Sequence, residues 1–68
     1  MRLGARNKLA GTITSIKLGG VMAEVVVSVG ENEIVSVVTR ASAEELGLAE
    51  GDAVIAVVKS TEVMLAKE

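Results

Sequence analysis

The 68-residue sequence contains no cysteine, no histidine and no aromatic residue. Without cysteine or histidine, the chain can form neither a disulfide nor a zinc site to stabilise its fold. The commonest general bases, the thiol nucleophile and the soft metal ligands are missing as well. Serine and lysine are present, but nothing in the sequence marks a base beside them. We therefore expect a protein that is not an enzyme, with no metal and no cofactor.

The absence of aromatic side chains also limits the core. A chain of this length buries only about 60% of the surface that its unfolded form exposes, and it has no large rings to fill a small interior. Yet half of its residues are hydrophobic (50%), and its mean hydropathy is +0.53. We predict a single domain over residues 1–68 that forms a homo-oligomer, because so small a domain cannot cover this much apolar surface alone.

Long hydrophobic runs and a strong net charge are missing too. No apolar run reaches the roughly 18 residues of a membrane span, and no signal-peptide core follows the first residues. We expect a cytoplasmic protein without a membrane partner. The net charge of −2 gives no general attraction to nucleic acid, and single-stranded nucleic acid is usually bound by aromatic stacking over a basic groove. No nucleic-acid partner is expected, and any anion site must be local.

The pattern of apolar residues predicts a mainly β protein with five short strands. The expected strands cover residues 8–17, with a bulge or bend at Gly11, and residues 21–29, 34–39, 54–58 and 62–66. The run 54–58 is apolar at both parities, which predicts that both of its faces are covered. One short helix is expected between the third and fourth strands, and this order is typical of a small Greek-key barrel of the OB type.

The expected helix has recognisable ends. Ser42 and Glu45 have the spacing of a capping box, in which each side chain bonds to the backbone N–H of the other residue. Gly47 supplies the residue at which the helix stops. We interpret Glu44 and Glu45 as electrostatic support for the helix start rather than as a catalytic carboxylate pair.

The polar residues Lys59, Ser60 and Thr61 follow the fourth strand directly. An ammonium, two hydroxyls and turning backbone N–H groups suit a small oxyanion. An ordinary polar turn is the alternative for these residues taken alone. Thr39 ends the third strand, and we expect that strand end to lie near Lys59. Arg6 is distant in sequence, so a neighbouring subunit is expected to supply it.

Several segments together resemble the molbindin, or Mop, family over nearly the whole chain. These segments are Ala5-Arg6-Asn7-Lys8-Leu9, Val38-Thr39-Arg40 with Ser42, Glu45-Leu46-Gly47-Leu48 and Val57-Val58-Lys59-Ser60. The resemblance implies a single OB-like domain that assembles as a hexamer, a trimer of dimers. It implies reversible storage of molybdate or tungstate between subunits, without chemical conversion.

The resemblance also implies a set of site residues. Gly4 and Arg6 would line one side of an interfacial pocket, where Gly4 stands at a position that often holds Ser in the family. Thr39, Val58 through its backbone, Lys59 and Ser60 would come from the other subunit. A second class of site is implied as well, with the turn Gly19-Gly20-Val21 as its candidate.

Two alternatives from other functional classes stay open. Residues 39–54 also resemble the swapped-hairpin DNA-binding domains of AbrB type. The negative net charge and the few basic residues of the amino-terminal half speak against this reading. A ligand-free structural oligomer is the third possibility, since the apolar strands alone would satisfy it.

Overall fold

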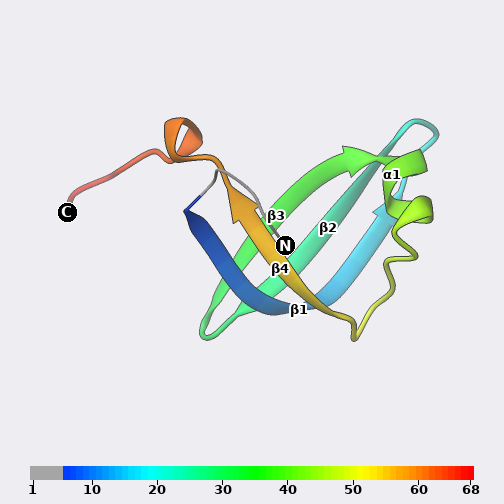
Figure 1. Cartoon of the computed structure of the whole chain (residues 1–68), viewed down its shortest axis with the longest axis horizontal. Coiled ribbons are helices and arrows are strands. Elements are labelled where there is room, and N and C mark those ends of the chain that lie inside the picture. Colours follow the sequence, from blue (N-terminus) through cyan, green and yellow to red (C-terminus); the bar gives the residue numbers. More distant parts are fainter. Residues whose placement is uncertain (1–5) are drawn as a thin grey trace.

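The computed structural model describes residues 6–68, which form one antiparallel sheet and one short helix (Figure 1). The elements are β1 (Asn7–Leu18), β2 (Met22–Val29), β3 (Asn32–Thr39), α1 (Arg40–Glu45), β4 (Ala53–Val58) and the 3-10 turn η1 (Ser60–Glu62). The strands lie in the order β3-β2-β1-β4. The prediction of a mainly β fold with a helix between the third and fourth strands is confirmed.

Strand β1 is long and curved, and its two halves pair with different neighbouring strands. Its residues 7–12 pair with β4, and its residues 12–18 pair with β2. The register with β2 shifts between Ile13 and Ser15, which is the signature of a β-bulge. The prediction of a bulge at Gly11 is therefore wrong by about three residues. The bulge lies just beyond the point where β1 changes partners, and it increases the local bend (Figure 1).

Gly11 is needed for a different reason, which is close approach to β2. A Cβ atom at this position would meet the backbone oxygen of Ser28 and lie 2.7 Å from Cγ1 of Val27. No ordinary side chain fits at such distances. Gly11 thus allows the two strands to cross tightly where the sheet coils.

The core is small and lies on one face of the coiled sheet. Ile13, Val25 and Val27 are its buried members. Ile16, Val29, Val38, Leu48 and Val54 are partly buried and pack against them. The residues of β2 alternate between buried and more exposed positions, as expected for a strand with one covered face.

Helix α1 begins one turn earlier than predicted. Thr39 is its N-cap, and the Thr39 hydroxyl accepts the backbone N–H of Ser42 at 3.1 Å. The predicted capping box with Ser42 as N-cap is wrong, because β3 runs directly into the helix and leaves Thr39 in the extended conformation that a cap requires. The predicted stop is confirmed. Gly47 has φ +63°, and its N–H donates to the Glu44 carbonyl at 3.0 Å.

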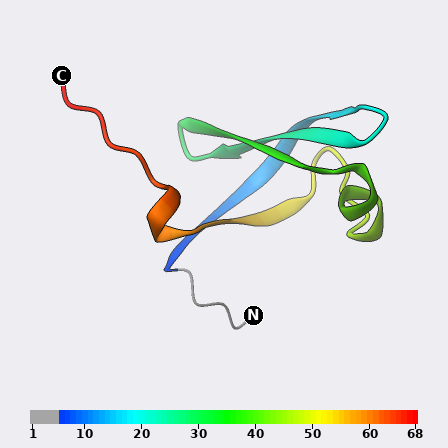
Figure 2. The same ribbon diagram turned by 90° about the horizontal axis from the view of Figure 1, so that it is seen from above.

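The chain leaves the sheet after β4 instead of forming a fifth strand. Ser60–Glu62 make the 3-10 turn, and residues 63–68 have no regular secondary structure. Figure 2 shows this tail pointing away from the sheet. Met64 and Leu65 are 92% and 93% exposed. The expected five-strand count is not confirmed, because residues 62–66 meet no strand edge of their own chain with which to pair.

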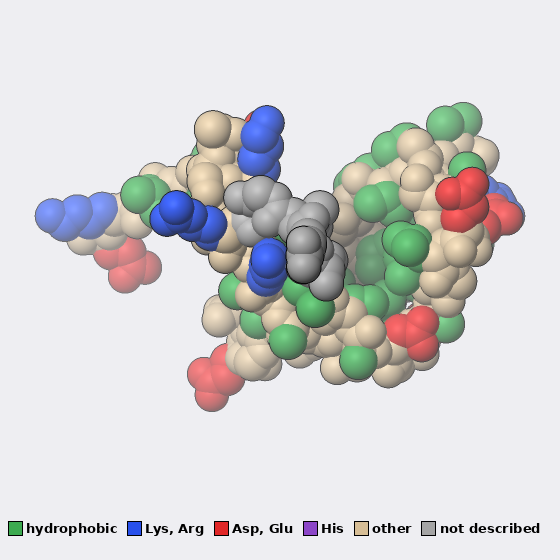
Figure 3. Space-filling model, viewed as in Figure 1, with side chains coloured by type: hydrophobic (Ala, Val, Ile, Leu, Met, Phe, Trp, Pro, Cys, Tyr) green, Lys and Arg blue, Asp and Glu red, His purple; other side chains and the backbone are tan. Residues whose placement is uncertain are grey.

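An open apolar groove separates the two outer strands of the sheet, β3 and β4. It has a volume of about 1040 Å³ and is lined by residues of both strands together with core side chains. In the space-filling view, hydrophobic side chains line a hollow in the molecule (Figure 3). Ile55 and Val57 are exposed on β4, as are Val35 and Val37 on β3. The prediction that both faces of β4 are covered is therefore wrong within one chain.

Candidate functional site

The start of β1 and the end of β4 lie side by side in the sheet. Asn7 is directly opposite Val58 in the antiparallel ladder. Arg6 immediately precedes this pair, and Lys59 immediately follows it. Neighbouring strands are about 4.8 Å apart, so both cations project from the same end of the sheet. The structure thus brings Arg6, Val58 and Lys59 together within one chain, although a neighbouring subunit was expected to be needed for this. Which copy of the chain supplies Arg6 to the anion stays a prediction.

This group of residues has the chemistry of an anion site. Arg6, Lys59 and Ser60 are all exposed, and they offer a fork of guanidinium donors, a compact ammonium and a hydroxyl. The recorded ion pair among residues 6–68 joins Arg40 to Glu44, so no described carboxylate neutralises Arg6 or Lys59. In Figure 3, most of the visible Lys and Arg side chains lie toward the end of the molecule that carries η1. Gly4 lies outside the described residues.

Thr39 lies at the opposite end of the sheet. Strands β3 and β1 run in the same direction, because each is antiparallel to β2, whereas β4 runs against β1. The last residues of β3 and β4 therefore point to opposite ends of the molecule (Figure 1). The prediction that Thr39 and Lys59 lie near each other is wrong within one chain. A pocket that contains both must take them from two copies.

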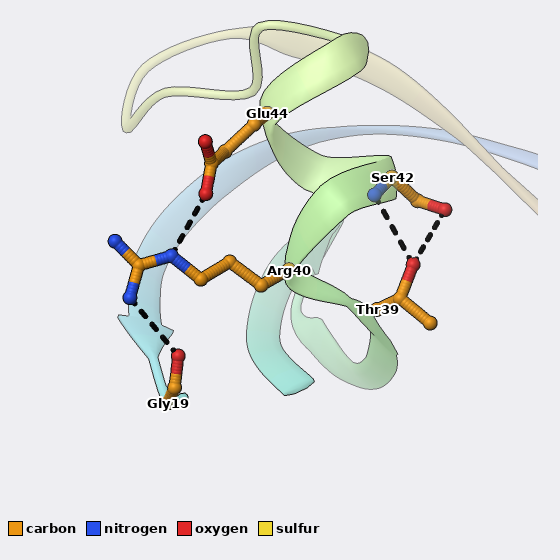
Figure 4. A network of polar contacts seen from close by, with 5 residues as sticks. All are labelled: Gly19, Thr39, Arg40, Ser42 and Glu44. Carbon is orange, nitrogen blue, oxygen red and sulfur yellow. Dashed lines mark hydrogen bonds and ion pairs between the residues drawn. The ribbon is translucent and has the colours of Figure 1, made fainter. Parts of the chain in front are cut away.

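Ser42 joins Thr39 as a second hydroxyl (Figure 4). The Thr39 hydroxyl donates to Oγ of Ser42 at 2.7 Å, and it accepts the Ser42 backbone N–H at 3.1 Å. The hydroxyl hydrogen of Ser42 is then free to point outward from this exposed pair. Sequence reasoning did not include Ser42 among the candidate site residues, because it assigned that side chain to the helix cap. The Thr-x-x-Ser spacing at the start of a helix is the signal that would have found the pair.

The turn between β1 and β2 is fastened to the helix by Arg40. The Arg40 guanidinium donates to Glu44 Oε1 at 2.8 Å and to the carbonyl of Gly19 at 3.1 Å (Figure 4). The backbone N–H of Arg40 donates to the carbonyl of Val21 at 2.7 Å. Two carbonyl oxygens of the turn thus face Arg40 and are occupied by it. The second class of site, expected at Gly19, Gly20 and Val21, stays a prediction.

Two other kinds of site were sought in the described part of the chain. Within residues 6–68, no three Asp or Glu side chains gather closely enough to hold a metal ion. The only α-helix described there has six residues, and no helix of these residues has the length and hydropathy to cross a membrane. The group at Arg6, Lys59 and Ser60 and the hydroxyl pair of Thr39 and Ser42 are therefore the candidate sites that the structure offers.

Comparisons with known proteins agree on one family. Residues 4–65 match the family model described as the TOBE domain. The molybdenum-pterin-binding protein 2 of Clostridium pasteurianum is 48% identical over 66 residues, which cover 96% of this chain and 97% of that protein. The molybdenum transport protein ModE of Azotobacter vinelandii is 51% identical over 69 residues, but the chain spans only 26% of its length.

A solved structure extends the agreement from sequence to fold. The molybdate-binding protein from Sporomusa ovata superposes with a TM-score of 0.94 at 40% sequence identity. The match covers 98% of this chain and all (100%) of that one. At this level of identity and coverage, the likeness includes the segments that carry Arg6, Thr39 and Lys59.

Proposed function

Because this chain belongs to the TOBE domain family, and within it to the Mop or molybdenum-pterin-binding proteins, we propose that it binds molybdate reversibly and stores it. One observation carries the proposal beyond family membership, namely that Arg6 and Lys59 flank the last pair of the β1–β4 ladder. Tungstate, which has the same charge and shape, is included as a second ligand. Binding involves no chemical conversion.

The donors at this strand end suit a tetrahedral dianion. Arg6 can offer two parallel N–H groups to two oxygens of the ligand, and Lys59 adds a point charge. The Ser60 hydroxyl and the backbone from Val58 onward supply neutral donors. Since the whole chain has a net charge of −2, attraction of a dianion depends on this local group. Selection against the smaller sulfate ion would come from cavity size and donor spacing.

The pocket is completed in this proposal by a second copy of the chain. Thr39 and Ser42 lie at the far end of their own sheet, so they would approach Lys59 from a neighbouring subunit. An interface would also strengthen each contact, because the effective dielectric constant falls from about 80 in water to about 20 near buried groups. We propose that the Ser42 hydroxyl donates to the same anion that Arg6 and Lys59 bind, and that the Thr39 hydroxyl orients it by donating to Oγ of Ser42.

The groove and the tail support such an assembly. The groove between β3 and β4 is apolar and open, and among the described strands each of these two pairs on one side only. The tail residues Met64 and Leu65 are apolar and contact little of their own chain, and Val63 before them is about half exposed (47%). We propose that the tail of one copy pairs with a strand edge of another, as extended segments commonly do. The fifth strand would then form between subunits, in a hexamer built as a trimer of dimers.

Equilibrium dialysis against molybdate in the presence of excess sulfate tests the proposal, with the oligomer mass measured on the same sample. Saturable binding that survives sulfate is the expected result. An intact oligomer that binds no molybdate would overturn the proposal. A gel shift with non-specific DNA at low salt would then separate a DNA-binding protein of AbrB type from a ligand-free structural oligomer. A cytoplasmic location belongs to the same proposal.

A further inference from the structure

We propose that Asn7 is a positioning residue for the oxyanion site, acting through the peptide group between Val58 and Lys59. The inference rests on the proposed function, which assigns Lys59 to the ligand. It adds a residue that touches no ligand but helps to hold one donor in its direction.

The side-chain amide of Asn7 holds the last carbonyl of β4. Its Nδ2 donates to the backbone oxygen of Val58 at 3.1 Å, across 51 residues of sequence. The Asn7 side chain is partly buried, whereas the neighbouring Arg6 and Lys8 are exposed. Asn7 and Val58 are also partners in the β1–β4 ladder, so the main chain already turns the Val58 carbonyl toward β1, and the side-chain bond secures it in that direction.

The direction of that carbonyl determines the direction of the next N–H. A peptide group is planar, and in its trans form the C=O and N–H bonds point to opposite sides. None of the described peptide bonds is cis. The Lys59 N–H therefore points away from β1, off the outer edge of the sheet, because β4 is an edge strand. Among residues 6–68, no backbone oxygen accepts it.

The Asn7 side chain thus reinforces the strand end that carries a free backbone donor in the middle of the cationic group. With the carbonyl held, the end of β4 is fixed in place. This strand end carries three donors, namely the Lys59 N–H, the Lys59 ammonium and the Ser60 hydroxyl. Without the side-chain bond, only the main-chain pairing would hold the end of β4, which would fray more often, and ordering it again would oppose binding. The role of Asn7 is to order these donors before the anion arrives.

The matched variants Asn7→Ala and Thr14→Val test this role in the assembled protein. Thr14 donates its hydroxyl to the carbonyl of Val26 at 3.3 Å, so Thr14→Val removes a bond of the same kind from another part of β1. Two readouts are needed, namely the molybdate dissociation constant and the NMR order parameter of the Lys59 amide. Oligomer mass is measured for each variant.

Asn7→Ala is expected to raise the dissociation constant for molybdate about 3- to 10-fold, the worth of one neutral hydrogen bond. It should lower the Lys59 order parameter from about 0.85 towards 0.6. Thr14→Val should change neither value. An unchanged dissociation constant in Asn7→Ala, or an equal rise in both variants, would overturn the inference.

Failure of the proposed function would give a different result. If the unaltered protein binds no molybdate, the proposed storage function is refuted. The order parameter of the Lys59 amide then tests by itself whether Asn7 holds the end of β4. A lower value in Asn7→Ala alone would support the anchor, and equal values in all three proteins would overturn it.

Discussion

Replacement of Lys59 by alanine tests whether the anion is bound in a pocket between subunits or on the exposed surface of one chain. Lys59 follows the last residue of β4 and is exposed in the single chain. In the proposed pocket, however, a second subunit covers it. The substitution removes one ammonium and leaves the β1–β4 ladder intact, since the Lys59 side chain makes no described hydrogen bond or ion pair within residues 6–68.

The size of the rise in the molybdate dissociation constant distinguishes a site shielded from water from an exposed one. A hydrogen bond between charged groups that is shielded from water contributes about 1.5–3 kcal/mol, which corresponds to a rise of about 10- to 150-fold in the dissociation constant. An exposed ion pair contributes only about 0.2–1 kcal/mol, or less than about 5-fold. A pocket between subunits therefore predicts the larger loss.

Isothermal titration calorimetry with molybdate provides the assay, and Lys17→Ala provides the control. Lys17 lies near the other end of β1, opposite Glu24, and its replacement changes the net charge of the chain by the same amount. We expect a loss of at least 10-fold for Lys59→Ala and less than about 2-fold for Lys17→Ala, a difference that follows from screening of distant surface charge. A loss below about 3-fold for Lys59→Ala, with the oligomer mass unchanged, would refute the interfacial site.

Three further substitutions test other parts of the structure. Gly11→Ala should lower the free energy of unfolding in urea by about 1–3 kcal/mol, because the new methyl group collides with β2. The control Gly20→Ala should not lower it, since a Cβ atom there meets nothing within 4 Å. Equal urea midpoints for the two variants would contradict the reasoning. Leu65→Asp should reduce the oligomer mass measured by light scattering, since it places a charge in the proposed contact between the tail and a strand edge of another copy; an unchanged mass would show that the tail is not buried there. Thr39→Val should cost about 1 kcal/mol of stability through loss of the N-cap and should also weaken molybdate binding, whereas Thr39→Ser should preserve both.

Local features of the fold could be predicted from the sequence with good accuracy. The alternation of valines defines β2, and the stop at Gly47 follows from the need for a positive φ angle at a helix end. The helix start was misplaced because Thr39 and Ser42 are both competent caps, three residues apart. The choice between them depends on where β3 ends, which is set by pairing with β2.

Features that depend on pairing between distant segments could not be predicted. The expected strand over residues 62–66 has the right composition, but a strand forms only where another edge is available. Likewise, nothing near Arg6 in the sequence indicates Lys59, because their proximity results from the ladder between Asn7 and Val58. The family resemblance supplied a set of candidate site residues, which stays a prediction, but it did not supply which of them lie together in one chain.

The pairing of β1 with β4 also has a consequence for the order of folding. The β2–β3 hairpin joins residues that are close in sequence, so it can form early, whereas the β1–β4 ladder must close a loop of some fifty residues and forms late. The cationic strand end therefore does not exist in a growing or partly folded chain, which has no Lys59 beside Arg6. In the proposed site, therefore, only a folded chain would capture the anion, and capture would in turn favour the folded state by mass action.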